Sequence, residues 1–184
     1  IALTLTDDDG GRDTAATSVS VDNMAPVIER LSATSVDENG VVHLTGAYSD
    51  IGTLDTHTLT INWGEGSPEA VSVSGGAFDI THRYLDDNPT GTASDVYMIA
   101  VTLTDDDLGA ATASASTTVN NVSPRLTGVQ ATSTVENGVV TLTGTIVDPG
   151  TLDTFTLNVT WGDMLSPNNV EQYTFGAGIS GRQS

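Results

Sequence analysis

Carboxylates form short clusters along this sequence, and two of the clusters are nearly identical. Residues 4–9 read TLTDDD, and residues 102–107 read TLTDDD again. The second copy contains Asp105, Asp106 and Asp107, while the segment SDIGTLD at 49–55 adds Asp50 and Asp55. Oxygen ligands without cysteine favour a hard divalent cation, and Ca²⁺ accepts about six to eight oxygens in irregular loops. The chemistry that these residues can support is therefore calcium binding.

These aspartates are expected to meet at one end of a β-sandwich, because sandwich topology fixes which loops share an end. The chain would enter at the same end through Asp22 and Asn23. Several carboxylates close together repel one another, and a bound cation would reverse that repulsion. The sequence thus predicts a metal site formed by Asn23, Asp50, Asp55, Asp105, Asp106 and Asp107.

The alternative for these loops is that they are solvated turns whose charge keeps the protein soluble. A second, more scattered acidic set is expected at the opposite end of the sandwich. It consists of Glu38, Glu65, Asp86 and Asp87.

Patterns typical of catalysis are weak or missing in the sequence. The three histidines are His43, His57 and His82, and neither a G-x-S-x-G nor an H-E-x-x-H motif occurs. The stretch GAGISG at 176–181 has the spacing of a dinucleotide-binding loop, but only three residues follow where a helix should open. It is interpreted as a turn. The segment is not expected to be an enzyme, and no cofactor other than Ca²⁺ is predicted.

The charge balance excludes several partners. Asp and Glu number 24 against five Lys plus Arg, which gives a net charge of −19, and lysine is absent. Phosphate binding needs clustered cations, so nucleic acid is not an expected partner. No apolar run approaches the length of a membrane span, so no membrane insertion is expected in this segment. The composition favours an exported protein, located outside the cell or at its surface.

The sequence repeats itself at an offset of 98 residues. Segments 23–66 and 121–164 are identical at 23 of 44 positions, and segments 1–22 and 99–120 at 13 of 22. A constant offset without gaps indicates tandem copies. The expected organisation is the last two strands of one repeat in 1–22, a complete repeat in 23–120 and the first part of a third repeat in 121–184.

Hydrophobic residues alternate with polar ones throughout the complete repeat, which is the signature of β-strands. Strands are predicted at 27–35, 41–48, 56–63, 69–74, 77–84, 96–104 and 111–119. Seven short strands in about 100 residues indicate an immunoglobulin-like sandwich. The predicted fold class is therefore all-β, with tandem seven-strand sandwiches of Greek-key type. Trp63 closes one alternating strand and is expected in the core.

Three ordered motifs in the repeat resemble the PKD (polycystic kidney disease) domain. They are INWGEGS at 61–67, THRY at 81–84 and VTLTDDDLG at 101–109. The departures from the PKD pattern are Glu65 in place of the usual Asp, the segment WGDML without its second Gly in the third repeat, and the absence of the usual Gly before the sixth strand. The resemblance implies an immunoglobulin-like fold, tandem arrangement and a spacer, adhesion or binding role in surface and secreted proteins of microbes.

The function expected from these observations is that of a structural or adhesive spacer repeat in a large matrix protein, adhesin or filament. Its expected partners are neighbouring repeats of the same or another chain, with an extracellular protein or glycan as ligand. The alternative is a carbohydrate- or protein-binding accessory module of a secreted hydrolase. Such modules display exposed aromatic side chains, so the exposure of Trp63 discriminates between the two.

Overall fold

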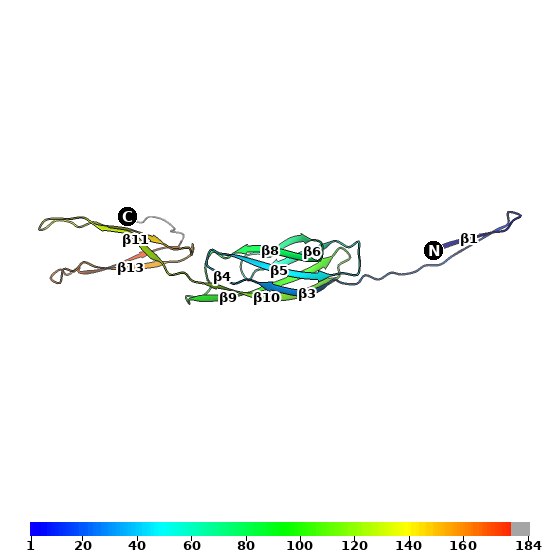
Figure 1. Ribbon diagram of the computed structural model, residues 1–184, viewed down its shortest axis with the longest axis horizontal. Coiled ribbons are helices and arrows are strands. Elements are labelled where there is room, and N and C mark those ends of the chain that lie inside the picture. Colours follow the sequence, from blue (N-terminus) through cyan, green and yellow to red (C-terminus); the bar gives the residue numbers. More distant parts are fainter. Residues whose placement is uncertain (178–184) are drawn as a thin grey trace.

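The computed structural model describes residues 1–177, and all of their regular elements are β-strands (Figure 1). In chain order they are β1 (Ala2–Thr6), β2 (Arg12–Ala16), β3 (Val27–Ala33), β4 (Val36–Asp37), β5 (Val41–Ser49), β6 (His57–Asn62), β7 (Glu69–Val73), β8 (Ala77–Arg83), β9 (Ser94–Asp105), β10 (Ala110–Asn120), β11 (Arg125–Ala131), β12 (Leu142–Val147), β13 (Phe155–Thr160) and β14 (Val170–Phe175). Of the glycine-rich stretch 176–181, all but Gly176 and Ala177 lies outside the described residues.

Strands β3 to β10 form one sandwich of two sheets. The smaller sheet has the order β3-β5-β8 and the larger has the order β4-β10-β9-β6-β7. All neighbours are antiparallel except β4 and β10, which are parallel. Each of the seven predicted strands is present, with ends within two residues of the prediction. The predicted immunoglobulin-like sandwich is confirmed, and the two-residue strand β4 is an addition that the sequence pattern did not indicate.

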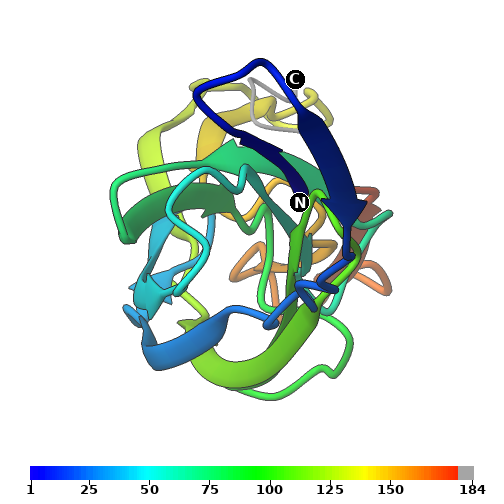
Figure 2. The same cartoon turned by 90° about the vertical axis from the view of Figure 1, so that its right-hand side faces the viewer.

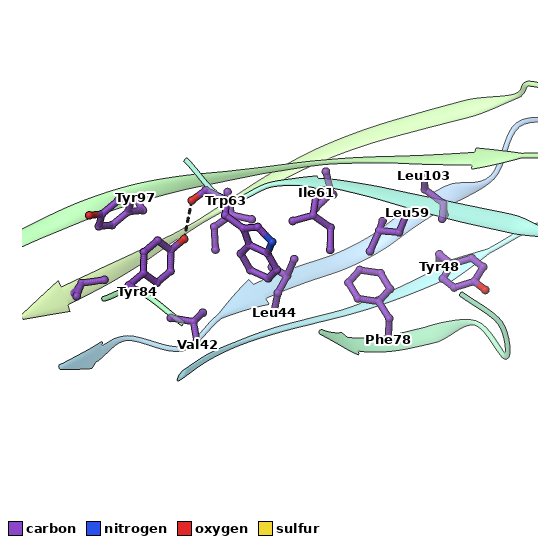
Figure 3. Close-up of a cluster of buried hydrophobic side chains, with 13 residues drawn as sticks. Val42, Leu44, Tyr48, Leu59, Ile61, Trp63, Phe78, Tyr84, Tyr97 and Leu103 are labelled. Carbon is purple, nitrogen blue, oxygen red and sulfur yellow. Dashed lines mark hydrogen bonds between the residues drawn. The ribbon is translucent and has the colours of Figure 1, made fainter. Parts of the chain in front are cut away.

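The core lies between the two sheets because one face of each strand is apolar. On β9 the residues Tyr97, Ile99, Val101 and Leu103 are buried, while the alternate residues Val96, Met98 and Ala100 are exposed. Figure 3 shows Tyr97 and Leu103 among the side chains of this core. Strands β5 and β6 bury alternate residues in the same way. Alternation at a period of two places every second side chain on the same face of a sheet.

Trp63 lies at the end of this core and is 2% exposed. The Tyr84 hydroxyl donates a hydrogen bond to the Trp63 carbonyl oxygen over 2.6 Å (Figure 3). The His82 ring stacks on the indole with ring centroids 4.7 Å apart, and the indole N–H donates to Glu69. The predicted burial of Trp63 is confirmed, and its indole N–H and carbonyl oxygen both have partners.

The hairpin β1–β2 repeats the strand pairing of β9–β10. Ala2 pairs with Ala16, just as Ala100 pairs with Ser114 exactly one repeat later in the chain. The environments differ: Leu5 is 75% exposed, whereas the corresponding Leu103 is fully buried. Within residues 1–177 the strands β1 and β2 pair only with each other. The expectation that another copy or a preceding part of the chain covers this hairpin stays a prediction.

The strands after residue 120 form two separate pairs, β11–β12 and β13–β14. Their apolar faces border an open cavity of about 380 Å³, whose lining includes Leu126, Leu157 and Trp161. The ribbon is elongated, with the hairpin at one end of the sandwich and these strand pairs at the other (Figure 1). Figure 2 views the chain from the hairpin end. The chain therefore enters the sandwich at one end and leaves it at the opposite end. No helix among the described residues has the length and apolar character needed to cross a membrane.

Replacement of Trp63 by alanine is expected to destabilise the sandwich by roughly 3 to 5 kcal/mol, because a large buried side chain leaves a cavity. The matched change at Trp161, which is only partly buried beside an open cavity, is expected to cost less. Urea or thermal unfolding of both variants measures the difference. An unchanged midpoint for Trp63→Ala would contradict the role of Trp63 in the core.

The amides of the β1–β2 hairpin are expected to exchange with solvent much faster than those of β9–β10, because an isolated two-stranded hairpin is marginally stable. Hydrogen exchange followed by NMR compares Leu3 and Leu5 directly with Val101 and Leu103. Strong protection of the first pair in a monomer would show that the hairpin needs no further partner.

Candidate cation sites at the two ends of the sandwich

The predicted aspartates meet where the chain enters the sandwich. Asp50 follows β5, Asp55 precedes β6 and Asp105 ends β9, so three different strands position them. One carboxylate oxygen from each lies within 4.8 Å of the others. Two oxygens on opposite sides of a Ca²⁺ ion are about 4.6 to 5.2 Å apart, since each lies about 2.3 to 2.6 Å from the ion. The spacing of these three residues therefore fits Ca²⁺; that they bind it stays a prediction.

The other three predicted residues surround this group without all joining it. The Asn23 side-chain amide donates to Asp105 Oδ2 over 2.9 Å, which ties the entering chain to the end of β9. Asp106 Oδ1 accepts the Thr56 backbone N–H over 2.8 Å, and Asp107 is exposed. Burial raises the pKa of Asp55, and the charges of neighbouring aspartates add to this rise.

Asp50, Asp55 and Asp105 form the entry-side group, and two of them have hydrogen-bond partners that the sequence did not indicate. Asp50 Oδ2 lies 2.9 Å from His57 Nε2, and Asp50 Oδ1 accepts the Gly52 N–H. The hydrogen bond from His57 is the main reason that the pKa of Asp50 is lowered. Asp105 Oδ1 accepts the Gly109 N–H over 2.7 Å. The proximity of His57, seven residues after Asp50 across a turn, was not apparent from the sequence.

A second acidic group lies where the chain leaves the sandwich. It contains Glu38, after β4, and Asp86 and Asp87, in the loop between β8 and β9; all three are buried. Glu65, which was expected at the same end, follows β6 at that end but belongs to neither set of three carboxylates there. Glu65 instead lies 2.9 Å from His82 Nε2, because His82 stacks on Trp63 at the neighbouring turn.

The following unit contributes Asp148 and Asp153 to this exit-side group. Both lie within ligand distance of Glu38, in a second set of three carboxylates. They flank the turn between β12 and β13, one repeat after Asp50 and Asp55. The repeat offset was the signal in the sequence for these two residues, because it places Asp148 and Asp153 at the start of the unit that follows the sandwich.

The exit-side carboxylates are strongly perturbed. Burial raises the pKa of Glu38 to about 7; the Val122 N–H opposes this rise, and the charges of Asp153, Asp148 and Asp86 add to it. Burial likewise raises the pKa of Asp153 to about 6, with further contributions from Asp86 and Asp148. Two unit charges about 5 Å apart repel by about 3 kcal/mol near a protein surface. The folded chain thus concentrates negative charge where solvation is poor.

Both groups offer only oxygen ligands, which is the donor set of Ca²⁺ and other hard cations. In the part of the chain that the structure describes, three carboxylate–histidine contacts link His43, His57 and His82 to acidic residues. The arrangement can therefore hold a cation or share protons.

No family model matches this chain, and no curated protein matches it at a significant level. Among solved structures, the chain is similar to the PKD domain of an M14-like peptidase from Thermoplasmatales archaeon SCGC AB-540-F20. The identity is 17% and the TM-score 0.35, over 52% of this chain and 91% of that one. It is also similar to the FN1–FN3 domains of chicken CNTN1, with 12% identity and a TM-score of 0.29, over 94% of this chain and 62% of that one.

In EDTA, the chain is expected to become more stable as the pH falls from about 8 to about 5. Between its ordinary pKa of 4.5 and about 7, Glu38 is protonated in the folded state and ionised in the unfolded state, so acidification favours folding. The effect is about 3 kcal/mol for a pKa raised this far. Thermal unfolding across this pH range measures it.

Glu38→Gln is expected to reduce this pH dependence. The matched control is Glu136→Gln, which changes the corresponding but exposed residue of the next repeat. Equal pH dependence in the two variants would contradict the assignment to Glu38.

Proposed function

We propose that this chain is a structural spacer from a large extracellular or cell-surface protein, such as a matrix protein, an adhesin or a filament. Residues 23–120 would be one complete repeat, preceded by the last strands of another repeat in 1–22 and followed by the first part of a third in 121–184. The observation that carries the proposal is the sandwich that closes its own core while the chain enters and leaves at opposite ends (Figure 1). Units of this kind extend a protein by simple addition.

Calcium would stiffen this array. On the entry side, Asp50, Asp55 and Asp105 would supply carboxylate oxygens, and Asn23 would connect the linker to them through Asp105. Asp106 and Asp107 would add negative charge that attracts the cation. Because the linker and the loops contact each other here, a bound ion would limit bending between units. The partners of the chain are then its own neighbouring repeats.

The second candidate function is a carbohydrate- or protein-binding accessory module beside a secreted hydrolase. Modules of that kind use an exposed aromatic surface, and Trp63 is 2% exposed and stacked by His82. Burial of Trp63 therefore supports the spacer over the binding module. Neither candidate requires catalysis by this chain.

Small-angle scattering tests the spacer function. The chain is expected to be extended, and its maximum dimension is expected to be larger in millimolar calcium than in EDTA, because bound ions restrain the linkers. The melting temperature should also rise with calcium, since a ligand that binds only the folded state stabilises it. A compact particle, or a dimension and melting temperature that calcium leaves unchanged, would contradict the proposal.

The binding-module alternative is tested in parallel with insoluble polysaccharides. The spacer is expected to remain in the supernatant with cellulose and chitin. The alternative would be favoured if the polysaccharide retained the wild-type chain but not the Tyr173→Ala variant. Tyr173 is chosen because it is the aromatic residue among the exposed large hydrophobic side chains of the described residues.

A further inference from the structure

We propose that the junction after residue 120 is a Ca²⁺ site assembled from two successive repeats. Glu38, Asp86 and Asp87 would contribute from the sandwich, and Asp148 and Asp153 from the unit that follows. Glu38 would be the common ligand, because it belongs to both sets of three carboxylates. This inference deepens the proposed spacer function and rests on it for its biological meaning. It concerns the exit side of the sandwich, opposite to the predicted metal site of Asp50, Asp55 and Asp105.

Buried carboxylate oxygens without partners point to a missing ligand at this junction. Glu38 is 3% exposed and Asp87 is 5% exposed, yet Glu38 Oε2 and Asp87 Oδ2 accept no hydrogen bond. Asp148 Oδ2 is also buried without a partner. Buried polar atoms are normally paired, and buried carboxylates are paired or coordinate metals. A divalent cation held by either set would give the free oxygen of Glu38 a partner together with carboxylates of that set.

The two sides of the junction are held together by the backbone as well. The Val122 N–H, in the linker, donates to Glu38 Oε1 over 2.7 Å, so the second oxygen of Glu38 is left free for a ligand. The Thr151 N–H, in the next unit, donates to the Leu85 carbonyl oxygen over 3.1 Å. These contacts position carboxylates from both repeats without using the oxygens that would bind the ion.

Gly150 allows the carboxylates to converge. A Cβ atom at this position would lie 2.2 Å from Glu38 Oε2 and 2.7 Å from Asp153 Oδ2. Both oxygens therefore point to the same small region beside the Gly150 backbone. A side chain larger than hydrogen would occupy the space in which the two carboxylates approach each other.

The histidine that partners the entry-side group is missing at the junction. Asp148 corresponds to Asp50, whose Oδ2 atom pairs with His57. Phe155 stands at the position corresponding to His57, and Asp148 Oδ2 has no partner. Among residues 1–177, none of the ion pairs involves the five junction carboxylates. His57 thus occupies one oxygen of Asp50 on the entry side, whereas the corresponding oxygen of Asp148 is left for an external cation.

The repeat makes the site periodic. Asp148 and Asp153 lie beside Glu38 of the unit before them. Asp50 and Asp55 occupy the corresponding positions, so they would lie beside the equivalent glutamate of a preceding unit. Each unit of an array would then offer carboxylates at both ends, and each junction would combine an exit-side set with an entry-side set. One cation site per junction would couple neighbouring units along the whole array.

Calorimetric titration of the intact chain with calcium chloride tests the inference. The test variant is Asp148→Asn with Asp153→Asn, and the matched control is Asp50→Asn with Asp55→Asn at the corresponding entry-side positions. The test variant is expected to lose the tighter binding and most of the calcium-dependent rise in melting temperature. The control is expected to lose only the weaker entry-side binding, and to retain the tighter junction binding with most of the rise in melting temperature. Circular dichroism confirms that the variants fold.

Gly150→Ala provides a second variant that changes no charge. It is expected to weaken calcium binding by crowding Glu38, whereas Gly52→Ala, which crowds Asp55 in the same way, is expected to retain junction binding. Should either junction variant fail to fold, Glu38→Gln replaces it with the same expected loss.

Calcium binding that is equal in the junction variants and the wild type would overturn the inference. Loss of all binding in the entry-side control alone would also overturn it, and would place the calcium at Asp50 and Asp55. An absence of calcium binding to every form of the chain would overturn it as well, and the junction carboxylates would then be groups that share protons. Junction binding without an extended particle in scattering would instead refute the spacer function and leave the metal site standing.

Discussion

Burial of one face of every strand against a single shared core is the constraint on which this molecule depends. The core is continuous from Tyr48 to Trp63 and Tyr84, and strands of both sheets contribute to it (Figure 3). Because the side-chain period of a strand is two, a slip of one residue would turn every buried residue outward. The register is therefore specified strongly, and with it the positions of all loops at the two ends.

The positions of the carboxylates follow from that register. Loops that are distant in the sequence emerge side by side, so Asp50 meets Asp105 at one end, and Glu38 meets Asp86 at the other. The hydrophobic effect stabilises the fold enough to hold like charges together, at the expense of some stability. Burial raises the pKa of Glu38, and the charges of neighbouring aspartates add to this rise. Because clustered carboxylates lower the stability of the fold when no cation is bound, a bound cation would raise that stability strongly.

Identical residues behave differently in this chain according to what covers them. Leu103 is buried between two sheets, whereas the matching Leu5 is exposed on a hairpin. Asp50 accepts a hydrogen bond from His57, whereas the matching Asp148 faces buried carboxylates of the neighbouring repeat. Tandem repetition thus supplies internal controls, because one sequence pattern is observed in two environments within a single molecule.

The sequence by itself determined the fold class, the seven strands and their buried faces, because these depend on local alternation and turn residues. It also indicated that Asp50, Asp55 and Asp105 approach one another, since sandwich topology places their loops at one end. Only the tertiary structure decided that His57 faces Asp50, that Glu65 turns to His82, and that Asp148 and Asp153 join Glu38. These contacts depend on side-chain direction and on how successive repeats meet, and neither is encoded in the period of a single strand.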